Sequence, residues 1–288
     1  MSDATRYLIT GAAGMLGQDL QRALEGRDVT ALRRQDLDIT DADAVAKAVE
    51  GYDVVLNAAA YTAVDDAETD EDAAYAINAT GPANLAKACA AAGAKLVHYS
   101  TDYVFQGDAD EPYDEDTPRN PLNAYGRTKA AGEEQALAAH PEGTYILRTA
   151  WLYGAGGPNF AKTMVKLAGS HPQLTVVDDQ RGQPTYTRDL AAQTVAMLDA
   201  GAPAGIYHAT NSGECTWFDF AREIFRLSGN DPERVAPTDS SAYSRPAARP
   251  AYSVLGHRRW HETGLAPMRP WTEALEAAAA DGVLTAEW

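Results

Sequence analysis

The first half of the chain alternates short segments that are apolar on both faces with longer stretches rich in Ala, Glu and Lys. The short segments are typical of strands buried on both sides, and the longer ones of helices. A chain that repeats this order folds into a parallel sheet with helices on both faces. The expected strands are 7–10, 29–32, 53–57, 95–99 and 145–148, and the expected helices are 16–24, 42–49, 71–92 and 125–139.

This pattern predicts an α/β fold with a Rossmann-type, doubly wound parallel sheet over residues 1–150, with returns to it near 174–212. Beyond residue 150 the pattern loosens, although helices at 188–198 and 217–227 and a strand at 205–208 are still expected. Several prolines in 231–250 favour an extended loop. Residues 151–288 are therefore expected to form mainly a smaller, substrate-binding lobe over the carboxyl edge of the sheet.

The composition excludes several classes of function. The 288 residues carry 24 Lys and Arg against 41 Asp and Glu, a formal net charge of −17. Such an excess of acid opposes binding to nucleic acid or to an anionic membrane, and no apolar run approaches the roughly 18 residues that span a bilayer. The two cysteines provide neither a disulfide framework nor metal-ligand spacing. A cytoplasmic protein with no membrane or nucleic-acid partner and no metal site is expected.

A glycine-rich turn follows the first expected strand and opens the first expected helix. Glycines at such a place permit a tight turn and let the backbone approach a pyrophosphate, whose charge meets the helix N-terminus. The spacing is G-x-x-G-x-x-G, and its position at the start of a βαβ unit gives it weight. The residues predicted to bind a dinucleotide here are Gly11, Gly14, Met15, Leu16 and Gly17.

The residue after the second strand usually selects the cofactor. An acid there holds the ribose hydroxyl of NAD, whereas an arginine accommodates the 2′-phosphate of NADP. The strand 29–32 runs into Arg33, with no acid before Asp36, which predicts a preference for NADPH. NADH remains an alternative, because Arg33 could equally be a surface charge. Asp38 and Ile39 are predicted to reach the adenine.

Tyr125 and Lys129 are four residues apart, which places a phenol and an ammonium on one face of the helix 125–139. Reduction of a carbonyl by hydride requires a proton donor at the developing alkoxide. Lowering the pKa of a phenol from about 10 to neutrality requires roughly 4 kcal/mol, and an ammonium about 4–5 Å away supplies about 3–4 kcal/mol. Tyr125, Lys129 and Thr101, which follows the fourth strand, are therefore predicted to be catalytic.

Longer motifs make the chain resemble a known family. The glycine turn, Asn57-Ala58-Ala59, the hydroxyl residue at 101 and Tyr-x-x-x-Lys are similar to the extended short-chain dehydrogenase/reductase superfamily. More specific blocks resemble the dTDP-4-dehydrorhamnose reductase family over nearly the whole chain: Asn57–Asp65, Tyr99–Phe105, Asn159–Met164 and Asp179-Gln180.

The resemblance implies a function: NADPH-dependent reduction of the C4 ketone of dTDP-4-dehydro-6-deoxy-L-mannose to dTDP-L-rhamnose, the last step of dTDP-rhamnose biosynthesis. It makes Tyr125 the proton donor, Lys129 its electrostatic partner and Thr101 a group that lowers the pKa of the tyrosine. It further implies that Thr101, Asp102 and Trp151 contact the sugar, and that Ala60, Tyr61, Thr62 and Tyr99 line the cofactor.

Several alternatives stay open at this point. Trp151 could instead fill the joint between the two lobes, and Arg249, which is predicted with Arg245 and Ser253 to clamp the substrate diphosphate, could only form a turn. Magnesium bridges a dimer through glutamates in some members of the family. The matching positions here are Asp19 and Arg188, so no metal is predicted, and a homodimer is left open.

Two other functions compete with the reductase. A sugar-nucleotide epimerase or dehydratase would share the fold, although dehydratases carry a Glu where this chain has Tyr103. A non-catalytic subunit that binds NADP and a partner enzyme would not need the complete set of Thr101, Tyr125 and Lys129.

Overall fold

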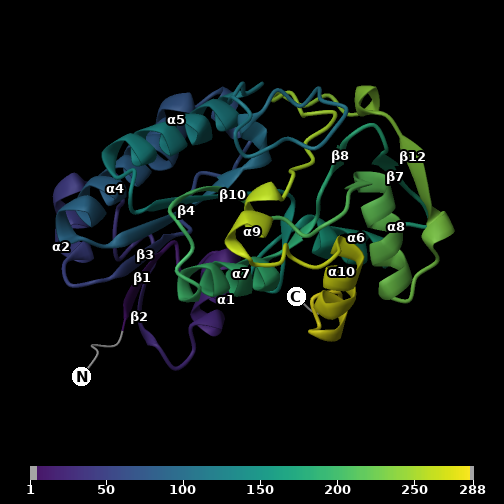
Figure 1. The fold of residues 1–288 in the computed structure, drawn as a ribbon. Helices are drawn as coiled ribbons and strands as arrows, with labels where there is room; N and C mark the ends of the chain where they lie inside the picture. The colour runs from purple at the N-terminus through teal and green to yellow at the C-terminus, as the bar shows by residue number, and fades with distance from the viewer. Residues whose placement is uncertain (1–4, 286–288) are drawn as a thin grey trace.

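The computed structural model describes residues 5–285, and its centre is a six-stranded parallel sheet (Figure 1). The strand order is β2-β1-β3-β4-β5-β10, so the chain leaves β1 for one edge and then returns to build the other. The strands are β1 (Arg6–Thr10), β2 (Asp28–Leu32), β3 (Val54–Asn57), β4 (Lys95–Thr101), β5 (Thr144–Thr149) and β10 (Gly205–His208).

Helices cover both faces of this sheet, as the doubly apolar strands predict. Apolar side chains of one face pack with those of α1, α7 and α9 in one buried cluster, and those of the other face pack with α2, α4 and α5 in a second. Figure 1 shows the two helical layers on opposite sides of the strands. The helices are α1 (Met15–Ala23), α2 (Ala42–Val49), α4 (Gly81–Ala92), α5 (Ala124–Ala139), α7 (Thr187–Asp199) and α9 (Arg258–Thr263).

The single helix expected at 71–92 is divided into three parts: α3 (Glu71–Tyr75), a π-helical turn η2 (Ala76–Thr80) and α4. The reason lies in Asn78, which is fully buried within η2. Its side chain accepts a hydrogen bond from the backbone N–H of Tyr61 and donates to the Tyr61 carbonyl and the Thr128 hydroxyl. Asn78 thus joins the loop after β3 to α5.

The second half of the chain adds a lobe with a hydrophobic core of its own. This core is built from α6 (Phe160–Ala168), α8 (Trp217–Leu227) and α10 (Trp271–Ala280), which Figure 1 shows beside the sheet. The short strands of this half pair outside the central sheet, β6 (Leu152–Tyr153) with β9 (Thr185–Tyr186), β8 (Arg181–Gly182) with β11 (Cys215–Thr216), and β7 (Leu174–Val177) with β12 (Val235–Thr238).

One expectation for this half is wrong in part. Residues 231–250 were expected to form an extended loop, yet β12 pairs with β7 in parallel over four residues and two short 3-10 turns, η4 (Pro232–Arg234) and η5 (Ser240–Ala242), flank it. Proline at position 237 is tolerated because a two-stranded ribbon has only edge strands.

The predicted doubly wound sheet is confirmed. Within the second half, β10 pairs in this sheet and α7 packs on it, whereas β7 pairs with β12 outside it. The division of the chain at residue 150 stays a prediction, and the outermost residues of its two parts, 1–4 and 286–288, lie outside the described residues. Within 5–285, no helix has the length and apolar character needed to cross a membrane.

Candidate active site

A cavity of about 650 Å³ opens at the carboxyl edge of the sheet, where an open α/β sheet binds its ligands. We call it the first cavity. Of the residues predicted from sequence to bind cofactor or substrate, twelve line it: Gly14, Met15, Leu16, Gly17, Ala60, Thr62, Tyr99, Thr101, Asp102, Tyr125, Lys129 and Trp151.

The glycine turn leaves the start of α1 accessible to a ligand. Gly11 has φ +70°, and a Cβ there would lie 2.5 Å from the backbone nitrogen of Ala59, so only glycine fits. A Cβ on Gly17 would lie 2.4 Å from the Gly11 carbonyl oxygen. No side chain caps the N-terminus of α1, and Gly14 to Gly17 line the first cavity. The first N–H groups of this helix are therefore available to an anion, which fits a pyrophosphate.

The helix α5 presents the predicted catalytic pair to the end of β4. The N-terminus of α5 is held by two acceptors, since Asn123 accepts from the N–H of Gly126 at 2.8 Å and Glu68 accepts from that of Ala124 at 2.8 Å. The ammonium of Lys129 donates to the Tyr99 carbonyl oxygen at 2.6 Å. The spacing of Tyr125 and Lys129 along α5 and the capping of its N-terminus thus place both side chains at the first cavity.

The electrostatics differ from the prediction in one respect. Burial raises the pKa of Tyr125 to about 12, and only the hydrogen bond with Thr101 counteracts it, in the predicted direction. Burial also lowers the pKa of Lys129 to about 8. The lowered tyrosine pKa that the sequence argument expected is therefore not found in this structure, because removal of both groups from water outweighs their favourable contacts.

Asp102 follows the last residue of β4, is buried, and lines the first cavity together with Tyr125 and Lys129. It accepts a hydrogen bond from the Thr101 hydroxyl at 2.9 Å on Oδ1, while its Oδ2 is buried without a hydrogen-bond partner among residues 5–285. Burial raises the pKa of Asp102 to about 6, against the lowering effect of the hydroxyls of Ser253 and Thr101. A buried acceptor of this kind is suited to a hydroxyl group of a ligand.

Trp151 lines the first cavity and stacks on Trp217, a residue that this cavity shares with a second one. It has φ +46°, the one positive φ among the described non-glycine residues, and its indole stacks on that of Trp217 with centroids 3.6 Å apart. Trp217 and Tyr103 line both cavities, so the two spaces share a wall. The strained backbone indicates that the surrounding structure holds this indole in a specific place.

The second cavity has a volume of about 620 Å³ and contains two of the three residues predicted to clamp the diphosphate, whereas the third, Ser253, is buried and does not line it. Its lining includes Arg245 and Arg249, and Arg249 forms a bidentate ion pair with Asp65 at 2.9 Å to each oxygen. Arg245 approaches the same carboxylate at 3.7 Å. Asp65 also accepts a hydrogen bond from the backbone N–H of Ala247. Sequence reasoning missed the role of this carboxylate, which holds Arg249 at the cavity and lies near the exposed Arg245.

The remaining predicted residues lie outside the first cavity. Arg33 is exposed at the end of β2 and is paired with Asp36 at 3.0 Å. The carboxylate of Asp38 accepts hydrogen bonds from Thr40, and the side chain of Ile39 is buried against α4. The predicted residues that do not line this cavity are Gly11, Arg33, Asp38, Ile39, Tyr61, Arg245, Arg249 and Ser253.

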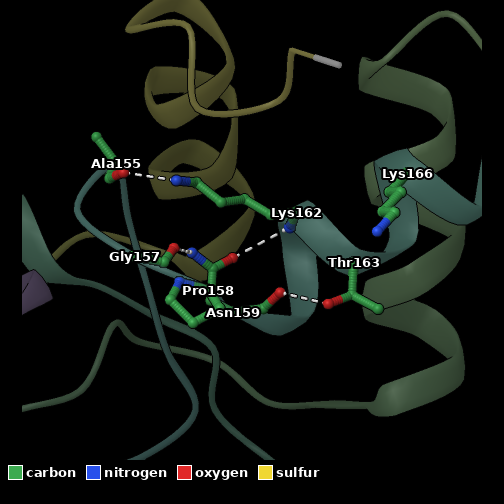
Figure 2. Close-up of a pocket in the computed structure, with 7 residues that line it drawn as sticks. All are labelled: Ala155, Gly157, Pro158, Asn159, Lys162, Thr163 and Lys166. Atoms are coloured by element: carbon green, nitrogen blue, oxygen red, sulfur yellow. Dashed lines mark hydrogen bonds between the residues drawn. The ribbon is translucent and has the colours of Figure 1, made fainter. Parts of the chain in front are cut away.

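A glycine-rich loop, residues 154–158, forms the outer rim of the first cavity and separates it from a third one of about 680 Å³ at the start of α6. Figure 2 shows how the loop is held: Lys162 donates to the Ala155 carbonyl, and Asn159 accepts from the N–H of Lys162. Asn159 also contacts the sulfur of Met15 at 3.6 Å, so the loop is tied to the turn that opens α1.

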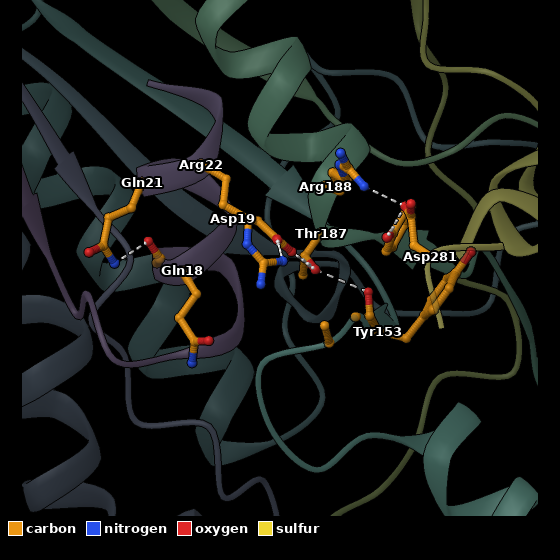
Figure 3. A network of polar contacts seen from close by, with 12 residues as sticks. Gln18, Asp19, Gln21, Arg22, Tyr153, Thr187, Arg188 and Asp281 are labelled. Carbon is orange, nitrogen blue, oxygen red and sulfur yellow. Dashed lines mark hydrogen bonds and ion pairs between the residues drawn. The ribbon is translucent and has the colours of Figure 1, made fainter. Parts of the chain in front are cut away.

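The positions that correspond to the family's metal-binding glutamates do not fit a metal ion. Asp19 is buried, accepts from the Thr187 hydroxyl at 2.6 Å and pairs with Arg22, and Arg188 pairs with Asp281 (Figure 3). A guanidinium cannot act as a ligand, and the hydrogen bond to Asp281 raises the pKa of Arg188. No group of three or more His, Cys, Asp or Glu side chains in 5–285 has an arrangement that could hold a metal.

The sequence matches the family model described as RmlD substrate binding domain over residues 5–283. It is 54% identical over 278 residues to the dTDP-4-dehydrorhamnose reductase of Streptomyces griseus, an alignment that covers 94% of this chain and 91% of that protein. The chain belongs to the dTDP-4-dehydrorhamnose reductase family. A protein of Streptomyces antibioticus described as a probable dTDP-4,6-dihydroxy-2-methyloxan-3-one 4-ketoreductase is 53% identical, covering 98% of this chain and 97% of that protein.

Solved structures of this family superpose closely. The crystal structure of a dTDP-4-dehydrorhamnose reductase from Clostridium acetobutylicum has a TM-score of 0.93 and 46% identity, and covers 98% of this chain and 100% of that one. That of the Bacillus anthracis enzyme, in complex with NADP, has a TM-score of 0.93 and 41% identity over 96% of this chain and 99% of that one. A dehydratase from Streptomyces venezuelae, 21% identical with a TM-score of 0.81, shares the fold alone.

Sequence reasoning missed several residues of the two cavities. Trp217 begins α8, more than sixty positions after Trp151, and no local motif marks it as a partner of that indole. Val64 and Tyr103 line the first cavity and lie inside the blocks that carry the family resemblance, which gave them no ligand-binding role, and Thr149 follows the expected strand 145–148. These three residues could have been predicted from their place at the ends of β3, β4 and β5, because ligands bind at the carboxyl ends of parallel strands.

Proposed function

We propose that this chain catalyses the NADPH-dependent reduction of the C4 ketone of dTDP-4-dehydro-6-deoxy-L-mannose, which gives dTDP-L-rhamnose. The observation that carries the proposal is the convergence of Thr101, Tyr125 and Lys129 on one cavity with the uncapped start of α1. This combines a proton donor and its cation with an anion-binding turn, which is the set of groups that a nicotinamide-dependent carbonyl reduction needs.

In this proposal Tyr125 donates its hydroxyl proton to the substrate oxygen as the ketone becomes an alkoxide. Bound NADPH supplies the hydride and leaves as NADP⁺, so one hydride and one proton reduce one carbonyl to an alcohol. The single proton of the Thr101 hydroxyl is donated to Asp102 in this structure, and in the proposal the hydroxyl turns to the substrate oxygen when the sugar binds. As a neighbour of the phenol, Thr101 also lowers the pKa of Tyr125. Lys129 places a positive charge beside the phenolate that forms and holds the nicotinamide ribose.

The cofactor is assigned to the first cavity. Gly14, Met15 and Leu16 would hold the pyrophosphate, and Ala60, Thr62 and Tyr99 line the cavity farther along. Arg33 is proposed to bind the 2′-phosphate of NADPH. It would have to turn from Asp36 to do so, and an exposed side chain is free to make that movement at little cost.

The sugar nucleotide is assigned to the joint between the cavities. Asp102 offers a buried acceptor for a sugar hydroxyl, and Trp151, which lines the first cavity, is proposed to contact the sugar. Arg249 is proposed to bind the diphosphate in the second cavity, where Asp65 holds the guanidinium in position. A homodimer and a cytoplasmic location remain predictions.

The proposal is tested by incubating the purified protein with NADPH and dTDP-4-dehydro-6-deoxy-L-mannose, following the loss of absorbance at the NADPH band and identifying the product by NMR. We expect stoichiometric conversion to dTDP-L-rhamnose. Failure to oxidise NADPH with this substrate, or tightly held NAD in the purified protein, would favour an epimerase or a dehydratase instead.

A second candidate is the reduction of a different dTDP-linked 4-keto sugar. It is favoured by one observation: relatives at 53% and 49% identity are named for other 4-keto sugars, one of them a dTDP-4-keto-6-deoxy-D-glucose reductase of Streptomyces niveus. Comparing kcat/KM for dTDP-4-keto-6-deoxy-D-glucose with that for the L-manno ketone distinguishes the two candidates.

A further inference from the structure

Glu133 and Arg148 form a buried ion pair one helical turn beyond Lys129 on α5, and the function proposed above gives this pair no role. Tyr125, Lys129 and Glu133 are spaced by four residues along α5, so they follow one face of the helix. Glu133 is fully buried, and Arg148 at the end of β5 is 1% exposed. Burying charged groups is costly, which calls for a reason beyond the stability of the fold.

The carboxylate of Glu133 is fully engaged. Arg148 binds it in bidentate fashion, with Nε 2.9 Å from Oε1 and Nη2 2.7 Å from Oε2. The Ser100 hydroxyl donates to Oε1 at 2.6 Å, and Arg119 reaches Oε2 at 3.3 Å. Arg148 is itself fixed, since it donates to the Glu115 carbonyl and packs on the ring of Phe105. These contacts keep the carboxylate ionised and immobile.

The same carboxylate is coupled to the catalytic groups through β4. Three consecutive residues of that strand act on α5: the Tyr99 carbonyl accepts from Lys129, the Ser100 hydroxyl donates to Glu133, and the Thr101 hydroxyl lowers the pKa of Tyr125. In the sheet, Ser100 is paired with Arg148. A displacement of Glu133 would move Ser100 and with it the adjacent residues of β4, Tyr99 and Thr101.

The charges around Lys129 leave Glu133 as its counter-charge. From β4, His98 is buried and its pKa is well below the usual value, so it is neutral. From α5 itself, the pKa of Tyr125 is raised, so the phenol is neutral too. Arg148 and Arg119 face Glu133 and are cationic. Burial lowers the pKa of Lys129, and Glu133 is the neighbour that raises it.

We propose that Glu133, held by Arg148, is a positioning residue that keeps Lys129 protonated and fixes it, with Thr101, for proton transfer. This proposal rests on the function proposed above, because it assumes that the Lys129 ammonium assists proton transfer from Tyr125 during the reduction. A purely structural ion pair would affect only the stability of the fold. A positioning role also requires that loss of the carboxylate charge make Lys129 easier to deprotonate.

The test is a titration of Lys129 that needs no turnover. Lysines labelled with ¹³C at Cε are followed by NMR against pH, with Lys129→Met to assign the signal. In Glu133→Gln we expect the midpoint of Lys129 to fall by about one pH unit or more, because an opposite charge one helical turn away is lost. The alkaline limb of kcat/KM should move to lower pH by the same amount.

The single variant leaves Arg148 without its partner, which can cost the fold, so Glu133→Gln combined with Arg148→Met is measured beside it. We expect a midpoint shift in the same direction, although smaller. The matched control is Glu71→Gln, which breaks the exposed pair with Arg127 on the same helix and should leave both the Lys129 midpoint and the pH profile unchanged.

An unchanged Lys129 midpoint in whichever of the two variants folds would overturn the inference. The proposed function would fail separately: wild-type protein that does not reduce the keto sugar would contradict the function, while a lower Lys129 midpoint in the Glu133 variants than in wild type would still support the role of Glu133.

Discussion

The two cavities that share the wall of Tyr103 and Trp217 are built in different ways. The first is lined by short contiguous segments at the ends of parallel strands, and it offers an uncapped helix start, small residues and backbone groups. The second draws its lining from segments scattered over 103–249, and its charged groups depend on the Asp65 carboxylate from the other half of the chain. The site that we propose for the cofactor is thus local and backbone-based, whereas the site that we propose for the substrate diphosphate is assembled from distant side chains.

The largest effect is expected at the end of the first cavity. Tyr125→Phe removes the proton donor and should lower kcat/KM by about 10²–10⁴-fold, the usual contribution of a positioned acid. NADPH binding, measured by fluorescence titration, should stay within a few-fold of the wild-type value. Turnover of the keto sugar at the wild-type rate would show that another group donates the proton.

The next effect separates the two cavities. Arg249→Met removes the charge-assisted contact that we propose with the diphosphate and should raise the KM for the sugar nucleotide by about 10–100-fold. The affinity for NADPH should not change. Arg127→Met is the control, because it breaks a similar bidentate pair, with Glu71, away from both cavities. A parallel loss of NADPH affinity in the Arg249 variant would remove the distinction between the two sites.

The pH profile tests the electrostatics of the first cavity. Burial lowers the pKa of Lys129 to about 8, so its charge is present below that pH and is lost as the pH rises. We expect kcat/KM to fall about tenfold for each pH unit above 8, since it reports the ionisation of the enzyme before substrate binds. Activity that persists unchanged to pH 10 would mean that the ammonium is not required.

The smallest effect is expected at the outer end of the cofactor site. Arg33→Ser removes a single exposed contact with the 2′-phosphate and should reduce the preference for NADPH over NADH by about tenfold, the value of one charge-assisted hydrogen bond near the surface. The ratio of kcat/KM for the two cofactors measures it, with Arg34→Ser as the neighbouring control. If the wild-type protein has the same kcat/KM with NADPH as with NADH, Arg33 is only a surface charge.

Much of the first half could be predicted from sequence. The alternation of apolar segments and helices predicted β1, β3, β4 and β5 to within a few residues, because strands buried on both faces must be apolar throughout. The single helix expected at 71–92 was less accurate, since the bonds that Asn78 makes with Tyr61 and Thr128 come from the tertiary fold. The pairing of β12 with β7 was missed for the same reason, because neither strand carries a pattern that names its partner.

The candidate site was predicted to a comparable extent. Residues of the first cavity lie in contiguous motifs, so a sequence alone brought Thr101, Tyr125 and Lys129 together. It did not predict that burial raises the pKa of Tyr125, since desolvation depends on everything packed around the phenol. Nor did it pair Arg249 with Asp65, which stands 184 positions earlier in the chain.

Sequence by itself thus determined the order of strands and helices, the glycine turn and the helical face shared by Tyr125, Lys129 and Glu133. These depend on backbone conformation and on spacings within one element, which the local residues dictate. Only the tertiary structure decided which charges meet: Glu133 with Arg148, Asp65 with Arg249, and Trp151 with Trp217. Such contacts join segments far apart in the chain, and their energies depend on how much water the completed fold excludes.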